Sequence, residues 1–461
     1  MPGRILGRIK ERVRNLSLQK AKQPLQRVKE GRIHQQLDHF DRLDVSTFPQ
    51  RFFVNEAHWR RPDGPVFLYI GGEGPISEST VLAGHHVAMA EEHGALLLAL
   101  EHRFYGDSIN PDGLKTENLS GLNSQQALAD LAVFHQHISQ SFSLSQRNTW
   151  ISFGGSYAGA LSAWFRGKFP HLVYGAVASS APVRAKLDFS AYSSVTKANA
   201  SEWKINTFLH TFQIELMQNL ADIIMGTVQY NEEGVLMSIN ELCGVMTNTS
   251  EAKVEEMRPY NRLVRLAKIY RSSSGEPCLD ISHEKTVTAL MDTTVHSGRR
   301  TERQWTYQTC TEFGFYQTCE DASCPFSGLV TLRSQTELCL MLFGISQDSL
   351  PERVAFTNTY YGGDNPHTHR VLYVNGGVDP WKELSVVRRR AEGGEGARTV
   401  FIQDAAHCAD MMSRRATDRR SLAEARQVRV QCYRVICRTD TGMMKHSFPP
   451  LRRSRNMWSA G

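Results

Sequence analysis

One serine in this sequence stands at a sharp corner of the chain. Ser156 lies in WISFGGSYAGALSAWFRGKFP (150–170), between a hydrophobic run and a segment with helical spacing. Two glycines precede it, and Ala158 and Gly159 follow it, where the usual G-x-S-x-G pattern has glycine at position 158. Small residues are needed where a strand turns sharply into a helix, because the two backbones approach closely. Such a turn would expose the serine hydroxyl as a nucleophile. The alternative interpretation of this segment is a glycine-rich turn in which the serine only caps the helix.

A serine hydroxyl is a weak nucleophile, so it needs a base and a carboxylate that orients the base. Asp379 follows the apolar run VLYVN within NGGVDPW (375–381), and His407 follows TVFIQ within DAAHCAD (404–410). The chain order Ser, Asp, His, with each residue placed after a strand, is typical of α/β-hydrolases. We therefore predict a catalytic triad of Ser156, Asp379 and His407.

Three other residues compete for these roles. His102, in EHRFYG (101–106), also follows an apolar run, but it precedes the nucleophile in the chain, so we expect a supporting role for it. Asp404 and Asp410 lie close to His407 and are rival acids, with loop or cap residues as the alternative interpretation.

Acyl transfer also needs hydrogen-bond donors for the negative oxygen that develops in the transition state. The backbone N–H of Tyr157, directly after the nucleophile, is the expected first donor. A second is expected from a loop after an early strand, either Gly72 in GGEG (71–74) or Tyr105 in EHRFYG, and the sequence does not choose between them. For GGEG the alternative is a tight turn without a catalytic role.

The elements that must position these residues alternate between strands and helices. Strand-like runs occur at 64–75, 94–106, 149–153, 174–183, 370–381 and 398–408. A helix is predicted over 124–142 with Ser124 as its N-cap. Strands separated by helices predict a parallel sheet. Between about 195 and 345 the alternation stops, so we predict an α/β-hydrolase fold with an inserted helical, cysteine-containing cap.

This pattern divides the chain into five parts. They are a basic, disordered N-terminal tail (1–35), a first hydrolase part with the nucleophile (36–194), the cap (195–345), a second hydrolase part with Asp and His (346–430) and a basic C-terminal tail (431–461). The net charge of +6 comes from the two basic ends. Neither end holds interleaved aromatic residues, which argues against nucleic-acid binding. No apolar stretch approaches the ~20 residues that span a bilayer.

Cysteines and N-x-[ST] triplets favour a secretory route. Six of the nine cysteines fall between 243 and 339, at spacings unlike those of a zinc ribbon or finger. Triplets begin at Asn15, Asn118, Asn199 and Asn248, and we predict glycosylation at the last three. The first 20 residues show no apolar signal-peptide core, which conflicts with that route.

No cofactor and no metal are predicted. His367 and His369 form an H-x-H pair beside Asp364, but a surface loop is the interpretation we favour over a zinc site.

Several short motifs resemble one known family. They are GGEGP, EHRFYG, FGGSYAG, KFPHL, ASSAPV, YQTCTEFGFY, NGGVDPW and AHCADM. From about residue 37 to about residue 425 the chain resembles the serine peptidases that include lysosomal Pro-Xaa carboxypeptidase and dipeptidyl peptidase II. The resemblance implies an α/β-hydrolase fold with a helical cap between the nucleophile half and the Asp/His half. It also implies Ser156 as nucleophile, Asp379 as acid and His407 as base.

From this resemblance we expect a serine peptidase that acts like an exopeptidase on prolyl bonds near a peptide terminus, including dipeptidyl-peptidase activity. Peptides are the expected substrates, a homodimer is the assembly considered, and endosomes, lysosomes or secretion are the expected locations. The alternatives are an esterase or lipase of the same fold and a catalytically inactive peptide-binding protein. Residues 195–235 look shorter than in the family, and 432–461 do not resemble its closing amphipathic helix.

Overall fold

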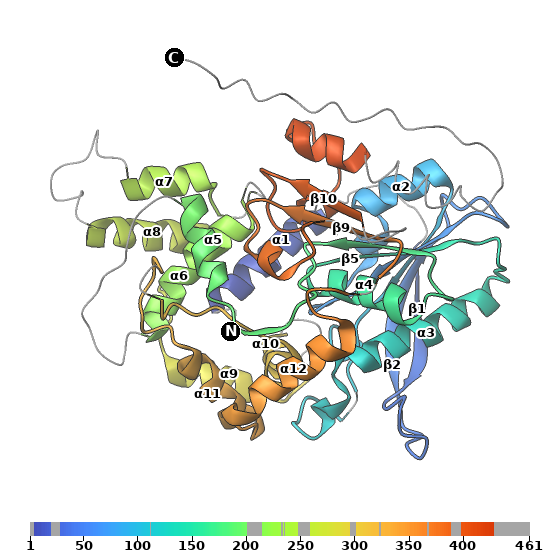
Figure 1. Cartoon of the computed structure of the whole chain (residues 1–461), viewed down its shortest axis with the longest axis horizontal. Coiled ribbons are helices and arrows are strands. Elements are labelled where there is room, and N and C mark those ends of the chain that lie inside the picture. The colour runs from blue at the N-terminus through green and yellow to red at the C-terminus, as the bar shows by residue number, and fades with distance from the viewer. Residues whose placement is uncertain are drawn as a thin grey trace.

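The computed structural model describes residues 4–19, 28–110, 112–200, 214–231, 234, 236–247, 259–295, 301–321, 324–366, 368–388 and 398–427. The described residues form one eight-stranded sheet with helices on both faces, and a helical part lies beside it (Figure 1).

The sheet has the strand order β1-β2-β4-β3-β5-β6-β9-β10. Its strands are β1 (Val28–Gln36), β2 (Thr47–Asn55), β3 (Val66–Ile70), β4 (Leu96–Leu100), β5 (Trp150–Gly155), β6 (Gly175–Ser179), β9 (Val371–Gly376) and β10 (Arg398–Ile402). Strand β2 runs antiparallel to both of its neighbours, and all pairs from β4 to β10 are parallel. Ser156, Asp379 and His407 follow β5, β9 and β10, which is the arrangement of an α/β-hydrolase and confirms the predicted fold class.

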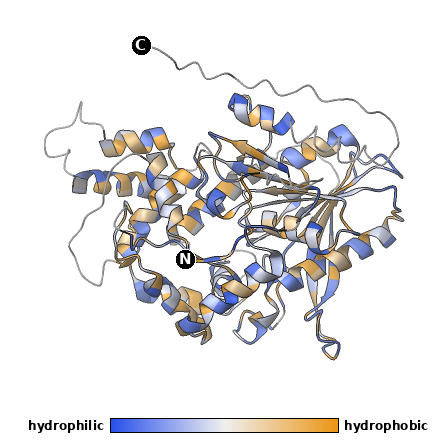
Figure 2. Cartoon of the chain, viewed as in Figure 1, coloured by the Kyte–Doolittle hydropathy of each residue, from blue (hydrophilic) through white to orange (hydrophobic). Residues whose placement is uncertain are grey.

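The central strands are apolar at nearly every position because both faces of the sheet are covered. Val66 and Leu68 of β3 belong to one hydrophobic core, and Phe67 between them belongs to the other. Helices α3 (Ser124–Ser141) and α4 (Tyr157–Lys168) contribute to the first core, and α2 (His85–His93) contributes to the second. Successive side chains point to opposite faces, so a strand buried on both sides lacks polar alternation. Figure 2 shows this hydrophobic colour along the central strands.

The N-terminal region corrects the prediction of a disordered tail over 1–35. Residues 4–19 form helix α1, and strand β1 begins at Val28. Ile5, Leu6, Ile9 and Val13 are between 1% and 7% exposed, and Ile9 and Leu6 lie over Gly226 of helix α6 (Ile214–Gln229). These apolar residues share one side of α1, and burial of that stripe holds the helix in place. The many basic residues dominate the composition and conceal this stripe. The basic tail predicted for 431–461 lies outside the described residues.

The predicted helical insertion lies between β6 and β9. Its helices are α5 (Ala191–Ala200), α6 (Ile214–Gln229), α7 (Ile239–Thr247), α8 (Pro259–Ser274), α9 (His283–Met291), α10 (Glu302–Gln308), α11 (Leu332–Phe343) and α12 (Leu350–Tyr361). Two short strands, β7 (Lys186–Asp188) and β8 (Gly314–Tyr316), pair as a second sheet. Disulfides join Cys310 to Cys339 and Cys319 to Cys324 within this part. The limits of 195 and 345 for the cap stay a prediction.

One buried carboxylate joins the insertion to the hydrolase body. Glu312 accepts hydrogen bonds from the backbone N–H of Ser124 at 2.8 Å and from its hydroxyl at 2.5 Å. Ser124 is therefore not the N-cap of α3. Asn123 has that role, because its side chain accepts the N–H of Gln126.

Among the described residues, no helix is both long and apolar enough to cross a membrane.

Candidate active site

Ser156 joins β5 directly to α4 with a strained backbone. Its φ is 58° and its ψ is −131°, a conformation that residues with a side chain rarely adopt. A Cβ at Gly154 would lie 2.0 Å from the carbonyl oxygen of Ala158, and one at Gly159 would lie 2.8 Å from that of Ser179. The turn therefore needs glycine at 154 and 159, whereas position 158 accepts alanine. This geometry is that of a nucleophile elbow.

Asp379 and His407 form a buried pair behind this turn. Asp379 follows β9 as the N-cap of a short helix, Pro380–Leu384, and accepts the N–H of Trp381 at 3.0 Å. His407 Nδ1 lies 2.9 Å from Asp379 Oδ2, and the two side chains are 4% and 0% exposed. An ionised carboxylate only accepts hydrogen bonds, so Nδ1 carries the proton and Nε2 is the basic nitrogen.

The contact with Asp379 raises the pKa of the His407 imidazole. Burial by itself would lower the pKa of His407, but the charge of Asp379 and its hydrogen bond raise that pKa well above the usual 6.5. Asp379 thus stabilises the cationic form that a base adopts once it has accepted a proton.

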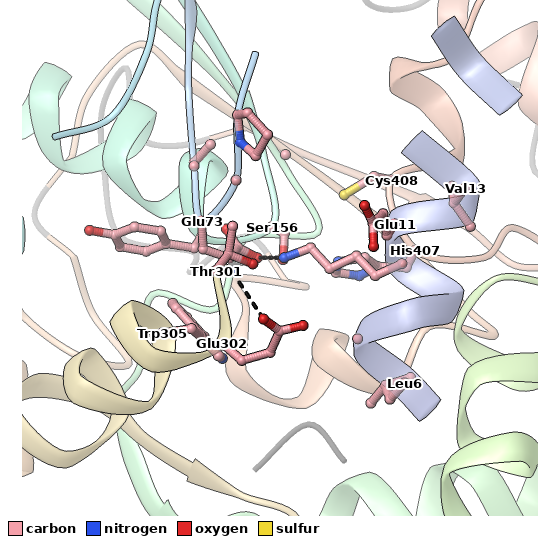
Figure 3. Close-up of a pocket in the computed structure, with 18 of the residues that line it drawn as sticks. Leu6, Glu11, Val13, Glu73, Ser156, Thr301, Glu302, Trp305, His407 and Cys408 are labelled. Carbon is pink, nitrogen blue, oxygen red and sulfur yellow. Dashed lines mark hydrogen bonds and ion pairs between the residues drawn. The ribbon is translucent and has the colours of Figure 1, made fainter. Parts of the chain in front are cut away.

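Ser156, Tyr157 and His407 line the same cavity of about 930 Å³. Three parts of the chain form its walls: the sheet loops, helix α1 and the insertion. Figure 3 shows Ser156 and His407 near its centre, with Leu6 and Val13 of α1 on one side and Trp305 of α10 on another. Asp379 is fully buried and does not itself line the cavity.

The two oxyanion candidates differ in their surroundings. Gly72 lines the cavity, and a Cβ built on it would lie 3.2 Å from the Cβ of Ala158, so its loop lies against the start of α4. Tyr105 is fully buried, its hydroxyl donates to Gln308 at 2.7 Å, and its backbone N–H donates to the carbonyl of His102 at 3.1 Å. Both donors of Tyr105 are therefore engaged, whereas Gly72 and Tyr157 both line the cavity.

The rival residues have other partners. His102 Nδ1 lies 2.7 Å from the carbonyl of Arg103, and its Nε2 lies 3.0 Å from the Tyr157 hydroxyl. Burial lowers the pKa of His102 to about 4, so it is a neutral support for the residue that follows the nucleophile. Asp404 accepts a hydrogen bond from the hydroxyl of Ser421, and Asp410 accepts one from the hydroxyl of Ser179.

Sequence reasoning missed Gln229, at the end of α6. Its carbonyl accepts the backbone N–H of His407 at 2.9 Å. Its side-chain Oε1 accepts the indole N–H of Trp381 at 3.0 Å and the hydroxyl of Tyr192. One residue of the insertion thus contacts the loops of both Asp379 and His407. No local pattern in the sequence indicates this role, because the partners lie far apart in the chain.

Sequence reasoning also missed the charge of Glu73. The GGEG loop was considered for its glycines, yet Glu73 lines the cavity and forms an ion pair with Lys10 at 2.5 Å. A charged residue inside a glycine-rich loop was the available signal.

The remaining predicted sites lie outside the cavity or outside the described residues. Asn118 is half-buried, and its amide nitrogen donates to the carbonyl of Asp112 at 2.9 Å, a contact that a glycan would have to replace. Asn199 belongs to α5, and Asn248 falls outside the described residues. Asp364 pairs with Arg184 at 3.0 Å, and His367 also falls outside the described residues.

Comparison with known proteins places this geometry in a family. The family model described as serine carboxypeptidase S28 matches residues 35–211 and 204–429. The thymus-specific serine protease of Homo sapiens is 40% identical over 439 residues, which cover 87% of this chain and 85% of that protein. Its counterpart from Mus musculus is 41% identical over 439 residues, covering 87% and 86%. The lysosomal Pro-X carboxypeptidase of Homo sapiens is 27% identical over 449 residues, covering 86% of each chain. The family model and these relatives match most of the chain, including the strained turn at Ser156. The chain therefore belongs to the serine carboxypeptidase S28 family and is a serine peptidase.

Proposed function

We propose that this chain hydrolyses peptide bonds through Ser156, His407 and Asp379. The observation that carries the proposal is the buried His407–Asp379 hydrogen bond, whose imidazole lines the same cavity as a serine on a strained turn. A serine on a strained turn, a histidine paired with a carboxylate, and a cavity that both side chains line are the features of an activated nucleophile.

The reaction begins when His407 Nε2 takes the hydroxyl proton of Ser156 during its attack on the peptide carbonyl. The N–H groups of Tyr157 and Gly72 stabilise the oxyanion of the tetrahedral intermediate. The imidazolium then donates its proton to the departing amine, and an acyl-enzyme remains on Ser156. Water, deprotonated by His407, hydrolyses the ester and restores the serine.

The finer parts of the proposal concern substrate and place. We propose an exopeptidase-like enzyme that cleaves at prolyl bonds and acts in endosomes or lysosomes or after secretion. The name of the lysosomal Pro-X carboxypeptidase relatives supports both points. A cavity walled by α1 and the insertion also favours short substrate ends over long chains. The homodimer and glycosylation at Asn118, Asn199 and Asn248 stay predictions.

Labelling with a fluorophosphonate probe at pH 5 and pH 7.5 tests the nucleophile. The probe should modify Ser156, as mapped by peptide mass spectrometry, and the Ser156→Ala variant should not react. Absence of labelling in a folded wild-type protein would overturn the proposal in favour of a peptide-binding protein. Turnover of short acyl esters without turnover of peptides would favour an esterase or lipase.

A further inference from the structure

A carboxylate reaches into the cavity beside the nucleophile. Glu73 comes from the GGEG loop between β3 and α2, and its side chain is only 10% exposed. Figure 3 shows it close to Ser156, on the other side of the serine from His407. Nothing in the acyl-transfer steps above uses this group.

A buried carboxylate needs a positive partner, because burial removes the water that stabilises its charge. Burial alone would raise the pKa of Glu73, but the charge and hydrogen bond of Lys10 lower it below its usual value. The carboxylate is therefore ionised while Lys10 Nζ lies 2.5 Å from its Oε1.

The partner comes from α1, outside the sheet and outside the insertion. Leu6, Ile9 and Val13 hold that helix through buried apolar contacts, and the backbone N–H of Leu6 donates to Asp222 at 3.3 Å. Lys10 is thus a primary ammonium group presented to the cavity on a separate element. A peptide with a free N-terminus carries the same chemical group.

Among the described residues, the other Lys and Arg side chains that line the cavity already have partners. Arg8 pairs with Glu276, Arg415 pairs with Asp418 at 3.2 Å, and Arg303 donates to the carbonyls of Leu114 and Leu290 at 2.8 Å. A substrate C-terminal carboxylate would meet the negative charge of Glu73 near the reacting serine. A substrate ammonium would meet a buried, complementary charge instead.

We propose that Glu73 is the subsite for the free α-ammonium group of a peptide substrate, and that Lys10 occupies this subsite in the present structure. The inference rests on the proposed peptidase function of Ser156. The N-terminal fragment of the peptide is then the acyl part: Ser156 Oγ bonds to its carbonyl carbon, the C–N bond breaks, and the remainder of the peptide leaves as an amine that carries the proton from His407. Water releases the short N-terminal fragment, and Lys10 competes with substrate for Glu73.

Matched chromogenic substrates test this subsite. Ala-Pro and Ala-Ala p-nitroanilides, each with a free and an N-acetylated terminus, are compared in the wild type, Glu73→Gln and Lys10→Gln. A charge-assisted contact should make Glu73→Gln lose about 10-fold or more in kcat/KM for the free amines, with little change for the acetylated forms. Lys10→Gln should lower KM for the free amines, because the internal competitor is gone. Equal kcat/KM for free and acetylated substrates in both the wild type and Lys10→Gln would overturn the inference.

The ion pair between Lys29 and Glu56 supplies matched controls. It has the same separation of 2.5 Å and lies at the surface. Lys29→Gln and Glu56→Gln should leave the preference between free and acetylated substrates unchanged.

Two readouts separate this inference from the proposed function. Fluorophosphonate labelling of Ser156 that persists without any preference for free amines overturns the subsite alone, whereas absence of labelling in the wild type overturns the peptidase proposal. Should Glu73→Gln disturb the loop, binding of Ala-Pro and N-acetyl-Ala-Pro to Ser156→Ala, with Lys10→Gln added, decides the matter by calorimetry. Tighter binding of the free amine supports the subsite, and equal binding overturns it.

Discussion

The Nδ1–H of His407 donates a hydrogen bond to Asp379 Oδ2 across 2.9 Å, and both side chains are almost fully buried. The hydrogen bond fixes both the tautomer and the orientation of the base. In the proposed mechanism, this bond lets Asp379 act on the reaction without lining the cavity itself.

Replacement of this acid should abolish efficient turnover. Asp379→Asn keeps the shape of the side chain but permits the wrong tautomer of His407, so kcat should fall by about 10³–10⁴-fold. Steady-state kinetics with a peptide p-nitroanilide measure the loss. Asp404→Asn, at a carboxylate that binds Ser421 instead, is the control and should change kcat by less than about threefold. A comparable loss in both variants would contradict the assignment of the acid.

The pH dependence of acylation follows from the pKa of the base. Only neutral His407 accepts a proton, and its pKa is raised by Asp379, so kcat/KM should increase with pH through an apparent pKa above 6.5. At pH 5 no more than about 3% of the enzyme would then hold a neutral base. Rates of fluorophosphonate labelling between pH 4.5 and 9 measure this profile. A rate that is maximal at pH 5 would show that substrate or another group reverses the shift.

The side chain of Gln229 should position the loop that carries Asp379. Gln229→Ala removes the side-chain acceptor for Trp381 and Tyr192, so the loop of Asp379 loses a contact, while the backbone carbonyl that accepts the N–H of His407 remains. We expect kcat to fall about 10-fold with a smaller change in KM, because Asp379 is then held less firmly against the base in the transition state.

Conservative replacement distinguishes positioning from general stability. Gln229→Glu keeps acceptor oxygens and should recover part of kcat. Gln218→Ala, on the same helix, removes a hydrogen bond to Asp222 and should leave the ratio of kcat to KM unchanged. A loss of kcat that follows thermal stability equally in Gln229→Ala and Gln218→Ala would refute the positioning role.

The contact between the insertion and the hydrolase body should depend on pH. Burial raises the pKa of Glu312 to about 7, above its value in the unfolded chain. The folded protein therefore retains a proton that the unfolded chain loses from about pH 4.5 upward, so this group contributes stability at low pH that is lost as pH rises through about 7. The contribution amounts to about 3 kcal/mol at most.

Urea unfolding at pH 5 and pH 8 measures this term. Glu312→Gln cannot ionise, so its free energy of unfolding should differ less between the two pH values than that of the wild type. The exposed Glu337 on α11 is the control, since Glu337→Gln should leave the difference as it is. An unchanged pH difference in Glu312→Gln would mean that the carboxylate does not titrate in this range.

Much of the fold and of the site could be predicted from local patterns. Apolar runs at β3, β4, β5, β6, β9 and β10 indicated strands, and the parallel sheet followed from the helices between them. Gly154 and Gly159 indicated the turn at Ser156, because only glycine fits where two backbone segments lie this close together. The positions of Asp379 and His407 after late strands were equally visible. Strand β1 at the edge of the sheet and strand β2 beside it were missed, because their mixed polar and apolar positions resemble a polar loop.

What the amino-acid sequence determined by itself is therefore what neighbouring residues enforce: the strands, the sharp turn at Ser156 and the placement of Ser156, Asp379 and His407 after successive strands. The tertiary structure decided which distant groups meet. The basic N-terminal segment forms helix α1, and its Lys10 pairs with Glu73. Asn123 caps α3 while Ser124 binds Glu312. Gln229 lies beside the loops of both Asp379 and His407. The physical reason is burial. A polar group removed from water must find a partner wherever the folded chain provides one, and no local spacing records that choice.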